Sequence, residues 1–339
     1  MSLQSENIHL KKIIHIPTIK DDGPGYEKIL GIAREVFDDP YHHFDFDFSR
    51  CAMIDHNAVV VLGALARYVD YHNTQMKLSK SMLLFSRSLT NVRSAPNVAG
   101  VMFLVETMNS AIRERLIGNN FLSHFSSGSL EGYPTGGYLG YREHNYLQDA
   151  DKIADHLQNE WLSASKLRLS DKLKPAITSR ILEVFSNAYG HGVSIQDIKT
   201  MGVYSCGQFN NKDKTLNISV LDFGPGIITN VKRVRGDMSN IDAMHWALVK
   251  GNSTRTDSQL SNIPRGLGLD LLHNFVHVNG GELRIHSNDV KVISNKTSGL
   301  IVEKCAGDLR GTMVSIKINC DDRYYRFTSE AEPTQQQYF

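Results

Sequence analysis

Three polar side chains recur at four-residue intervals in the stretch "ILEVFSNAYGHG", which runs over residues 181–192. They are Glu183, Asn187 and His191. At about 100° per residue these positions share one narrow face of a helix, while Phe185 lies on the opposite side and can face a core. A carboxylate can hold and deprotonate a water or a hydroxyl, and an amide oxygen suits a hard cation such as Mg²⁺. A solvated face on a surface helix is the alternative interpretation of this stretch taken alone.

A second stretch, "LDFGPGI" over residues 221–227, ends an expected strand with a carboxylate and two closely spaced glycines. Asp222 can accept a hydrogen bond from the amino group of an adenine. Gly224 and Gly226 let the backbone approach a base and a sugar where any Cβ would clash. Taken alone, this stretch is more often a turn than a ligand site.

A third stretch, "PRGLGLDLL" over residues 264–272, places Gly266 and Gly268 immediately before an expected helix. Backbone N–H groups at a helix N-terminus, together with the helix dipole, favour the oxygens of a triphosphate. A fourth stretch, "RGTMVSI" over residues 310–316, sets Thr312 at the start of the last strand.

The order of these four stretches resembles that of the GHKL ATPase superfamily. The superfamily contains DNA gyrase, the heat-shock chaperone ATPase, histidine kinases and the mismatch-repair protein MutL. The similar part covers about residues 145–320: a helix with E-x-x-x-N, a strand with D-x-G-x-G, G-x-G-L before a helix, and a G-T strand. The resemblance implies a Bergerat fold, with an ATP site between a sheet and its helices. The form "NAxxHG" looks most like the anti-sigma-factor serine kinases of this superfamily.

The resemblance also implies a role for individual residues. Glu183 matches the general base and Asn187 the Mg²⁺ ligand. Asp222 matches the residue that reads adenine, with Thr312 beside it through a water. The positions that match nucleotide contacts are Gly224, Gly226, Gly266, Leu267 and Gly268.

Residues 251–264, "GNSTRTDSQLSNIP", occupy the position of a mobile ATP lid. Their Ser, Thr, Asn and Gly content suits a flexible loop. Arg255 and Arg265 are candidates to reach the γ-phosphate, whereas His191 is expected only to close its helix.

The first part of the chain resembles a different fold. Residues 44–65, "FDFDFSRCAMIDHNAVVVLGAL", are similar to a STAS domain, the fold of anti-sigma-factor antagonists, over about residues 40–120. Those proteins carry an Asp-Ser turn whose serine is phosphorylated by the partner kinase. Here the turn reads Asp55-His56-Asn57, so no hydroxyl is present. An unrelated small α/β domain is the alternative.

Periodicity predicts the elements of both parts. In the first part we expect a strand at 44–48, a helix at 55–72 capped by Asp55, a strand at 76–85 and a helix at 98–116. In the second part helices come first, with Ile153, Leu157 and Trp161 at four-residue spacing and Pro175 near the start of the next helix. A helix is also expected around 267–280. Strands are expected at 201–206, 215–224, 281–288, 299–306 and 311–319.

The predicted class is therefore α+β: a Bergerat sandwich whose mixed sheet is covered by helices on one face, preceded by a small α/β domain. The predicted boundaries are 1–120 for the small domain and 121–145 for a glycine-rich linker. The ATP-binding domain is expected over 146–322 and a loose tail over 323–339.

Composition restricts the partners and the compartment. The 37 basic and 36 acidic residues give a net charge of +1, which offers no field for nucleic acid or an anionic membrane. No apolar run reaches the length of a spanning helix. The four cysteines are widely spaced, so neither a zinc site nor a disulfide framework is indicated, and a cytoplasmic protein fits best.

The expected function is that of a Mg²⁺-dependent ATP-binding regulator, either an ATPase or a protein serine kinase, acting on a partner protein or as a homodimer. Two alternatives remain: an ATP-driven conformational switch, and a nucleotide-binding interaction module without phosphotransfer.

Overall fold

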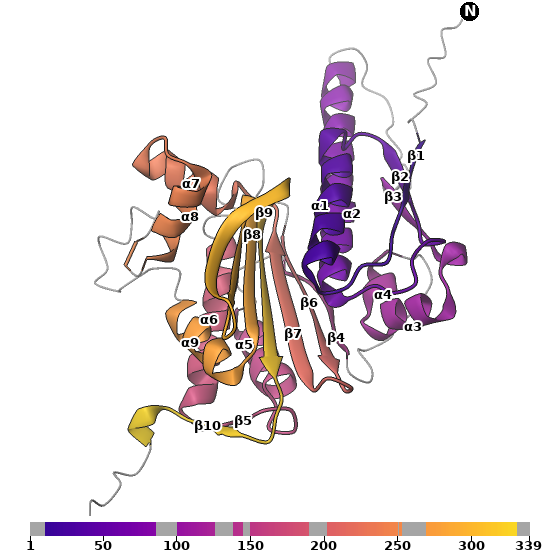
Figure 1. The fold of residues 1–339 in the computed structure, drawn as a ribbon. Coiled ribbons are helices and arrows are strands. Elements are labelled where there is room, and N and C mark those ends of the chain that lie inside the picture. Colours follow the sequence, from indigo (N-terminus) through magenta and orange to yellow (C-terminus); the bar gives the residue numbers. More distant parts are fainter. Residues whose placement is uncertain are drawn as a thin grey trace, which may run out of the picture.

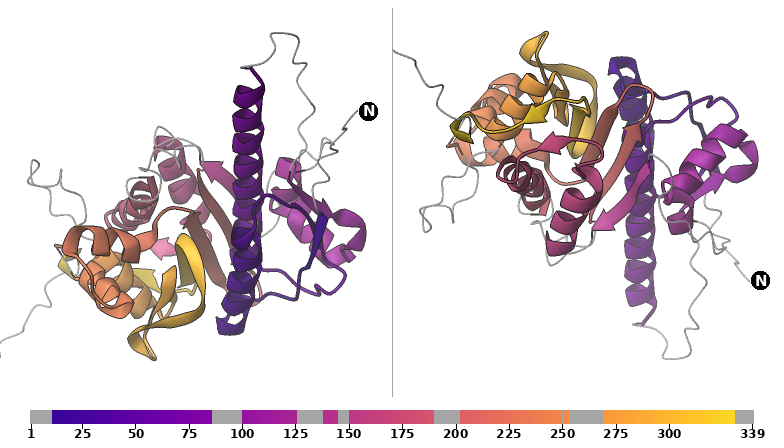
Figure 2. Two further views of the ribbon diagram at one scale, coloured as in Figure 1. Left: turned by 90° about the horizontal axis from the view of Figure 1, so that it is seen from above. Right: turned by 90° about the horizontal axis from the view of Figure 1, so that it is seen from below.

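The chain combines two sheets with several layers of helices. The computed structural model describes residues 11–85, 100–125, 138–144, 150–189, 202–249, 251–252 and 269–330. In this part of the chain a five-stranded sheet stands between two helical layers, and a three-stranded sheet lies beyond one of them (Figures 1 and 2). The predicted α+β class is confirmed at this level.

The N-terminal unit alternates strands and helices. Its elements are β1 (Lys11–His15), α1 (Gly23–Asp38), β2 (His43–Asp47), α2 (His56–Phe85) and β3 (Val101–Leu104). The strands pair in parallel in the order β1-β2-β3, because each helix carries the chain back to the same edge of the sheet. A short 3₁₀ turn (Val105–Thr107), α3 (Ser110–Gly118) and α4 (Phe121–Phe125) follow.

Helix α2 corrects two expectations. Its start after Asp55 agrees with the sequence, but the helix continues to Phe85, so the strand predicted at 76–85 is wrong. The apolar run in this segment is compatible with a strand, but its Lys, Leu and Met residues also have high helix propensity. The Asp55 carboxylate does not cap α2. It accepts a hydrogen bond from the backbone N–H of Asp21 and pairs with Arg115 at 2.5 Å.

The helix predicted at 98–116 is wrong in its first half. Val101–Leu104 form strand β3, and the helix begins only at Ser110, where the side chain of Asn109 accepts a hydrogen bond from the N–H of Ile112 at 2.9 Å. A short buried strand shows a continuous apolar run, which periodicity alone does not separate from the start of a helix.

The large sheet has the order β4-β6-β7-β9-β8, and every neighbouring pair is antiparallel. Its strands are β4 (Tyr138–His144), β6 (Val203–Asn210), β7 (Thr215–Asp222), β8 (Glu282–Asn295) and β9 (Gly299–Asn319). Short turns join β6 to β7 and β8 to β9, and short turns produce antiparallel neighbours. The prediction of a mixed sheet is therefore wrong, and the two strands expected at 299–306 and 311–319 are one.

Helices cover one face of this sheet. They are α5 (Ala150–His156), α6 (Leu173–Asn187), α7 (Gly226–Arg235), α8 (Asn240–Leu248) and α9 (Leu269–Asn279). The expected apolar side chains Ile153, Leu157 and Trp161 are buried in the core beneath them, the last two in a π-helical turn after α5. Helices α7 and α8 are not among the predicted elements.

The other face of the sheet is also covered, by α1 and α2 of the N-terminal unit (Figure 1). Tyr204 on β6, Leu221 on β7 and Met313 on β9 belong to the same buried cluster as the residues of α1 and α2. Successive side chains of a strand point to opposite faces, so each of these strands contributes to both cores. The expectation that helices cover only one face is corrected.

Strands lie within the segments predicted as the linker and as the tail. Strand β4 is the edge strand of the large sheet, although its residues fall in the predicted linker 121–145. The first residues of the predicted tail form β10 (Tyr324–Tyr325), which pairs in parallel with β5 (Arg168–Leu169), and a 3₁₀ turn (Thr328–Glu330) follows.

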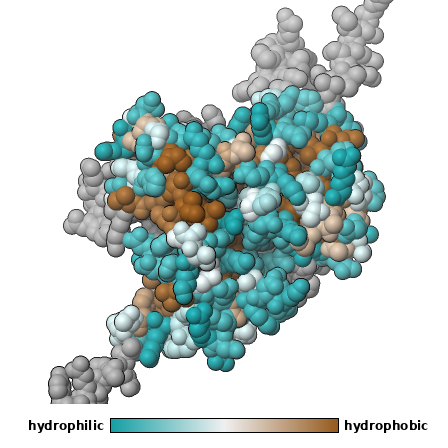
Figure 3. Space-filling model, in the orientation of Figure 1, coloured by the Kyte–Doolittle hydropathy of each residue, from teal (hydrophilic) through white to brown (hydrophobic). Residues whose placement is uncertain are grey.

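The surface is largely hydrophilic in the view of Figure 3, with separate hydrophobic areas between the polar residues. Large exposed apolar side chains lie on several elements, among them Ile13 on β1, Met102 on β3 and Leu300 on β9. Single exposed apolar residues are normal in globular proteins. Within the described part of the chain, no helix has both the length and the apolar character needed to cross a bilayer.

Candidate functional site

Five residues form a row across one end of the large sheet. His144 on β4 pairs with Val203 on β6, Val203 with Asp222 on β7, Asp222 with Thr312 on β9, and Thr312 with Ser287 on β8. Directly paired residues of neighbouring strands share a face of the sheet. Val203 belongs to the core beneath α6 and α9, so the whole row faces that helical layer.

Helix α6 covers this end of the sheet. The ring of His144 meets the ring of Phe185 edge-on, with centroids 5.1 Å apart. Glu183 and Asn187 flank Phe185 on this helix, and both side chains are half-buried. The helix predicted around them is confirmed, with Pro175 in its first turn. The structure thus places α6, which carries Glu183 and Asn187, in the helical layer that Asp222 faces.

Glu183 has a charged neighbour on its own helix. Nη1 of Arg180, which lies one turn earlier in α6, is 2.9 Å from Oε2 of Glu183. The pair is partly exposed, so water screens it and its stabilising contribution is small. Because α6 directs positions i, i+3 and i+7 to one side, Arg180, Glu183 and Asn187 form a continuous polar line.

Asp222 is a buried carboxyl with unusual electrostatics. Only 4% of it is exposed, and its Oδ1 accepts a hydrogen bond from the N–H of Gly224 at 2.9 Å. Burial raises the pKa of Asp222 to about 7, and the Gly224 hydrogen bond opposes that rise. A carboxyl that titrates near neutrality inside a site is a candidate for ligand contact.

The glycines beside Asp222 are required by the protein itself. Gly226 has φ of +79°, and a Cβ there would come within 2.3 Å of the Asn288 side chain. At Gly311, where φ is +141°, a Cβ would lie 2.0 Å from the carbonyl oxygen of Asp222. Both positions therefore exclude larger residues even without a ligand. The fold itself thus explains the glycine at position 226, as an alternative to the predicted contact with a nucleotide.

A hydroxyl connects the two motif segments at this end of the sheet. Ser287 is fully buried, and its Oγ lies 2.8 Å from the N–H of Ile227, 3.0 Å from the carbonyl oxygen of Gly311 and 2.9 Å from Oγ1 of Thr312. Sequence reasoning missed Ser287 because its stretch reads only as a strand. Its role depends on pairing between distant segments, for which a single sequence carries no signal.

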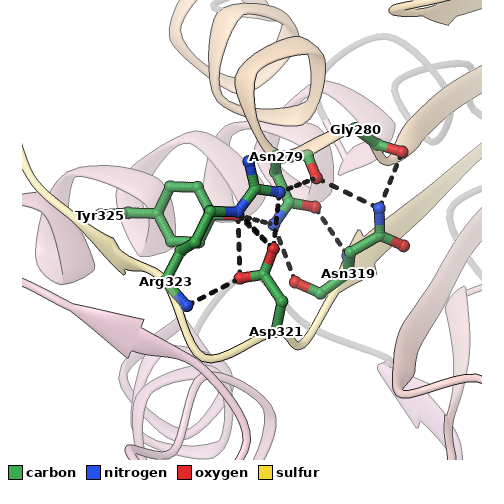
Figure 4. A network of polar contacts seen from close by, with 6 residues as sticks. All are labelled: Asn279, Gly280, Asn319, Asp321, Arg323 and Tyr325. Atoms are coloured by element: carbon green, nitrogen blue, oxygen red, sulfur yellow. Dashed lines mark hydrogen bonds and ion pairs between the residues drawn. The ribbon is translucent and has the colours of Figure 1, made fainter.

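Helix α9 is fixed at its C-terminal end by the polar network of Figure 4. Asn279 is fully buried; its Nδ2 donates to the carbonyl of Asn319 at 2.8 Å and to the hydroxyl of Tyr325 at 3.0 Å, and its Oδ1 accepts from the N–H of Asn319. The Tyr325 hydroxyl also reaches Asp321. The network joins the end of α9 to the end of β9, and so holds the helix against the sheet.

Other predicted site residues lie outside the described part of the chain. They are His191, Arg255, Arg265, Gly266, Leu267 and Gly268. The same holds for the predicted lid at 251–264 beyond its first two residues. Their predicted roles remain predictions.

The described residues contain no group of three or more His, Cys, Asp or Glu side chains placed to hold a metal ion. The predicted Mg²⁺ site needs no such group, because Mg²⁺ keeps several waters and is held mainly by phosphates and one or two protein ligands. Asn187 fits that single role, and the buried acceptor Asp222 fits an adenine amino group.

The turn that resembles the phosphorylated turn of STAS domains lies inside the N-terminal unit. His56 and Asn57 are buried, and Asp55 is held by Arg115. Burial lowers the pKa of His56, so the ring is held neutral. This turn has neither a hydroxyl nor an exposed side chain at its central positions.

Comparison with known proteins adds no relative to this picture. No protein-family model matches the chain, and no curated protein sequence matches it either.

Proposed function

We propose that the chain binds ATP with Mg²⁺ at the Asp222 end of the large sheet, as a regulator of the GHKL type that hydrolyses ATP or transfers its phosphate to a protein serine. The observation that carries this proposal is the position of Asp222. A buried carboxyl ends a strand beside Thr312 and in front of the Gly224–Gly226 turn, and it faces the helical layer that includes α6 with Glu183 and Asn187.

The side chains divide the task by their chemistry. Ionised Asp222 accepts a hydrogen bond from the adenine amino group. Asn187 would hold Mg²⁺ through its amide oxygen, and the ion would supply positive charge to neutralise the phosphates. Glu183, one turn before Asn187, takes a proton from an attacking water or hydroxyl. Arg180 places a positive charge 2.9 Å from that carboxylate.

A second candidate is the ATP-driven switch, and one contact favours it. Phe223, next to Asp222, packs edge-on against Phe37 of α1 and Tyr68 of α2, with centroids 5.1 and 5.8 Å apart. Arg310, two residues before Thr312, donates to the carbonyl of Phe37 at 3.0 Å. Both sides of the proposed adenine site therefore have neighbours that touch the N-terminal unit.

Calorimetric titration with ATP, with and without Mg²⁺, tests the site. Asp222→Asn should weaken ATP binding by about 1–3 kcal/mol, the usual cost of removing a buried charged acceptor. Asn187→Ala should abolish the effect of Mg²⁺ on affinity, whereas Asn159→Ala, on an exposed turn after α5, should not. Equal affinity in wild type and Asp222→Asn would reject the site.

Incubation with Mg²⁺ and γ-labelled ATP, with and without cell extract, separates the activities. Label on a protein supports the kinase, free phosphate supports the ATPase, and neither supports a switch or an interaction module that only binds.

A further inference from the structure

We infer that Ser287 is a positioning residue that sets base specificity, because it draws the hydroxyl proton of Thr312 away from the site and leaves Thr312 as a proton acceptor beside Asp222. The inference rests on the proposed function and adds a determinant outside the four motifs. Its starting point is the set of contacts around one buried hydroxyl.

The directions of these hydrogen bonds follow from counting protons. The N–H of Ile227 can only donate, so Ser287 Oγ accepts there. The carbonyl of Gly311 can only accept, so Ser287 gives it its single proton. The remaining contact, with Thr312 Oγ1 at 2.9 Å, is then a hydrogen bond only if Thr312 donates.

The strand geometry explains why Gly311 needs this donor. The register between β8 and β9 pairs Ser287 with Thr312 and Asn288 with Leu309, so Arg310 and Gly311 have no partner residue on β8. Gly311 is buried, and a buried carbonyl without a donor is costly. The Ser287 hydroxyl therefore supplies a hydrogen bond where the β8–β9 ladder is interrupted.

The consequence is an edge that accepts protons and has none to give. Asp222, when ionised, has only acceptors, and Thr312 donates its hydroxyl proton to Ser287. A base with an amino group at position 6, such as adenine, meets this edge with N–H donors. A base with a carbonyl there, such as hypoxanthine, places its oxygen against two acceptors. Without Ser287, the Thr312 hydroxyl is free to turn and donate to that carbonyl.

The test compares ATP with ITP, which carries hypoxanthine, by calorimetry at pH 8, where Asp222 is ionised. Wild type should prefer ATP, and Ser287→Ala should reduce the ATP/ITP preference by roughly tenfold, the weight of one hydrogen bond changing direction. In a Thr312→Val background the same Ser287→Ala change should leave the ratio unaltered. A purely structural role of Ser287 would weaken both nucleotides equally in both backgrounds.

Circular dichroism confirms that each variant folds. If Ser287→Ala does not fold, Ser287→Cys replaces it, because a thiol keeps the volume but is a weak donor and acceptor. An unchanged ATP/ITP ratio in a folded Ser287 variant overturns the inference and leaves the proposed site intact. A wild type that binds neither nucleotide overturns both.

Discussion

At the scale of single residues, Asp222 connects stability with the proposed ligand. Its carboxyl has an ordinary pKa of 3.8, and burial raises that pKa to about 7 in the folded chain. The folded state therefore holds the proton more tightly than the unfolded state. The stabilisation from this proton is complete below about pH 4 and is lost as the pH rises through 7.

Asp222→Asn should consequently change stability in a pH-dependent way. The amide keeps an oxygen for the Gly224 N–H but carries no charge to bury. The difference in free energy of unfolding, variant minus wild type, should increase by on the order of 3 kcal/mol when the pH is raised from 5 to 8. Urea unfolding of both proteins at the two pH values measures this gain. The same difference at both pH values would mean that Asp222 does not titrate between them.

Glu183 provides the second residue-scale prediction. Glu183→Ala should bind ATP as wild type does but turn it over roughly 10²–10⁴-fold more slowly, the usual loss when a general base is removed. Asp171→Ala, an exposed acidic residue just before α6, is the control and should keep full turnover. Steady-state phosphate release and calorimetry on the same samples provide the comparison. Full activity in Glu183→Ala would remove the base assignment.

At this scale, the sequence predicts the role of a residue only where that role depends on residues nearby in the chain. Asp222 lies at the end of a strand and Gly226 in the turn that follows, and both features can be predicted from adjacent residues. The structure has both features. Ser287 was not predictable, because its partners Ile227 and Thr312 lie 60 and 25 residues away in the chain. Only the pairing of β8 with β9 brings them together.

At the scale of elements, the buried network at Asn279 joins α9 to β9. Asn279→Ala should destabilise the chain by about 2–4 kcal/mol, because it leaves the N–H and carbonyl of Asn319 without their partner. Asn210→Ala, at the last residue of β6, removes side-chain hydrogen bonds to Lys212 and Asp213 in the turn that follows and is the matched control. Its cost should stay below about 1 kcal/mol.

Chemical denaturation of the two asparagine variants measures both values. If they lose equal stability, the network at the end of α9 contributes no more than a surface turn.

The elements themselves were predictable where a pattern had one physical meaning. Strand β7 and helix α6 show clear periodicity and lie where they were expected. The failures are apolar runs that suit a helix and a buried strand equally: 76–85 is the end of α2, and 101–104 is β3. In these cases tertiary contacts decide, and a single sequence does not contain them.

At the scale of the whole molecule, the N-terminal unit and the large sheet share one core. Phe37 of α1 contacts Tyr68 and Phe223, and Arg310 lies over its ring. A division of the chain into two independent domains was the natural expectation from its glycine-rich stretch. That expectation did not include the second face of the sheet, where Tyr204, Leu221 and Met313 also join a buried core.

The shared core predicts a single cooperative unfolding transition. Both tryptophans, Trp161 and Trp246, lie outside the N-terminal unit, so their fluorescence reports on the other part of the molecule. Phe37→Ala should cost about 3–5 kcal/mol and move the tryptophan transition together with the far-ultraviolet circular dichroism. Ile13→Ala, an exposed residue of β1, should move neither. An unshifted tryptophan transition in Phe37→Ala would show that the two parts unfold independently.

The two helices behind the large sheet also affect how the chain folds while it is being synthesised. Translation proceeds from the N-terminus, so α1 and α2 leave the ribosome long before the strands they will meet. The contacts of Phe37 and Tyr68 with Phe223 form only after Phe223 has been made, and β9 is the last of the three strands on that face to be made. Until β6, β7 and β9 have been made, the nascent chain carries two helices whose apolar side chains lack the partners that they have in the folded molecule.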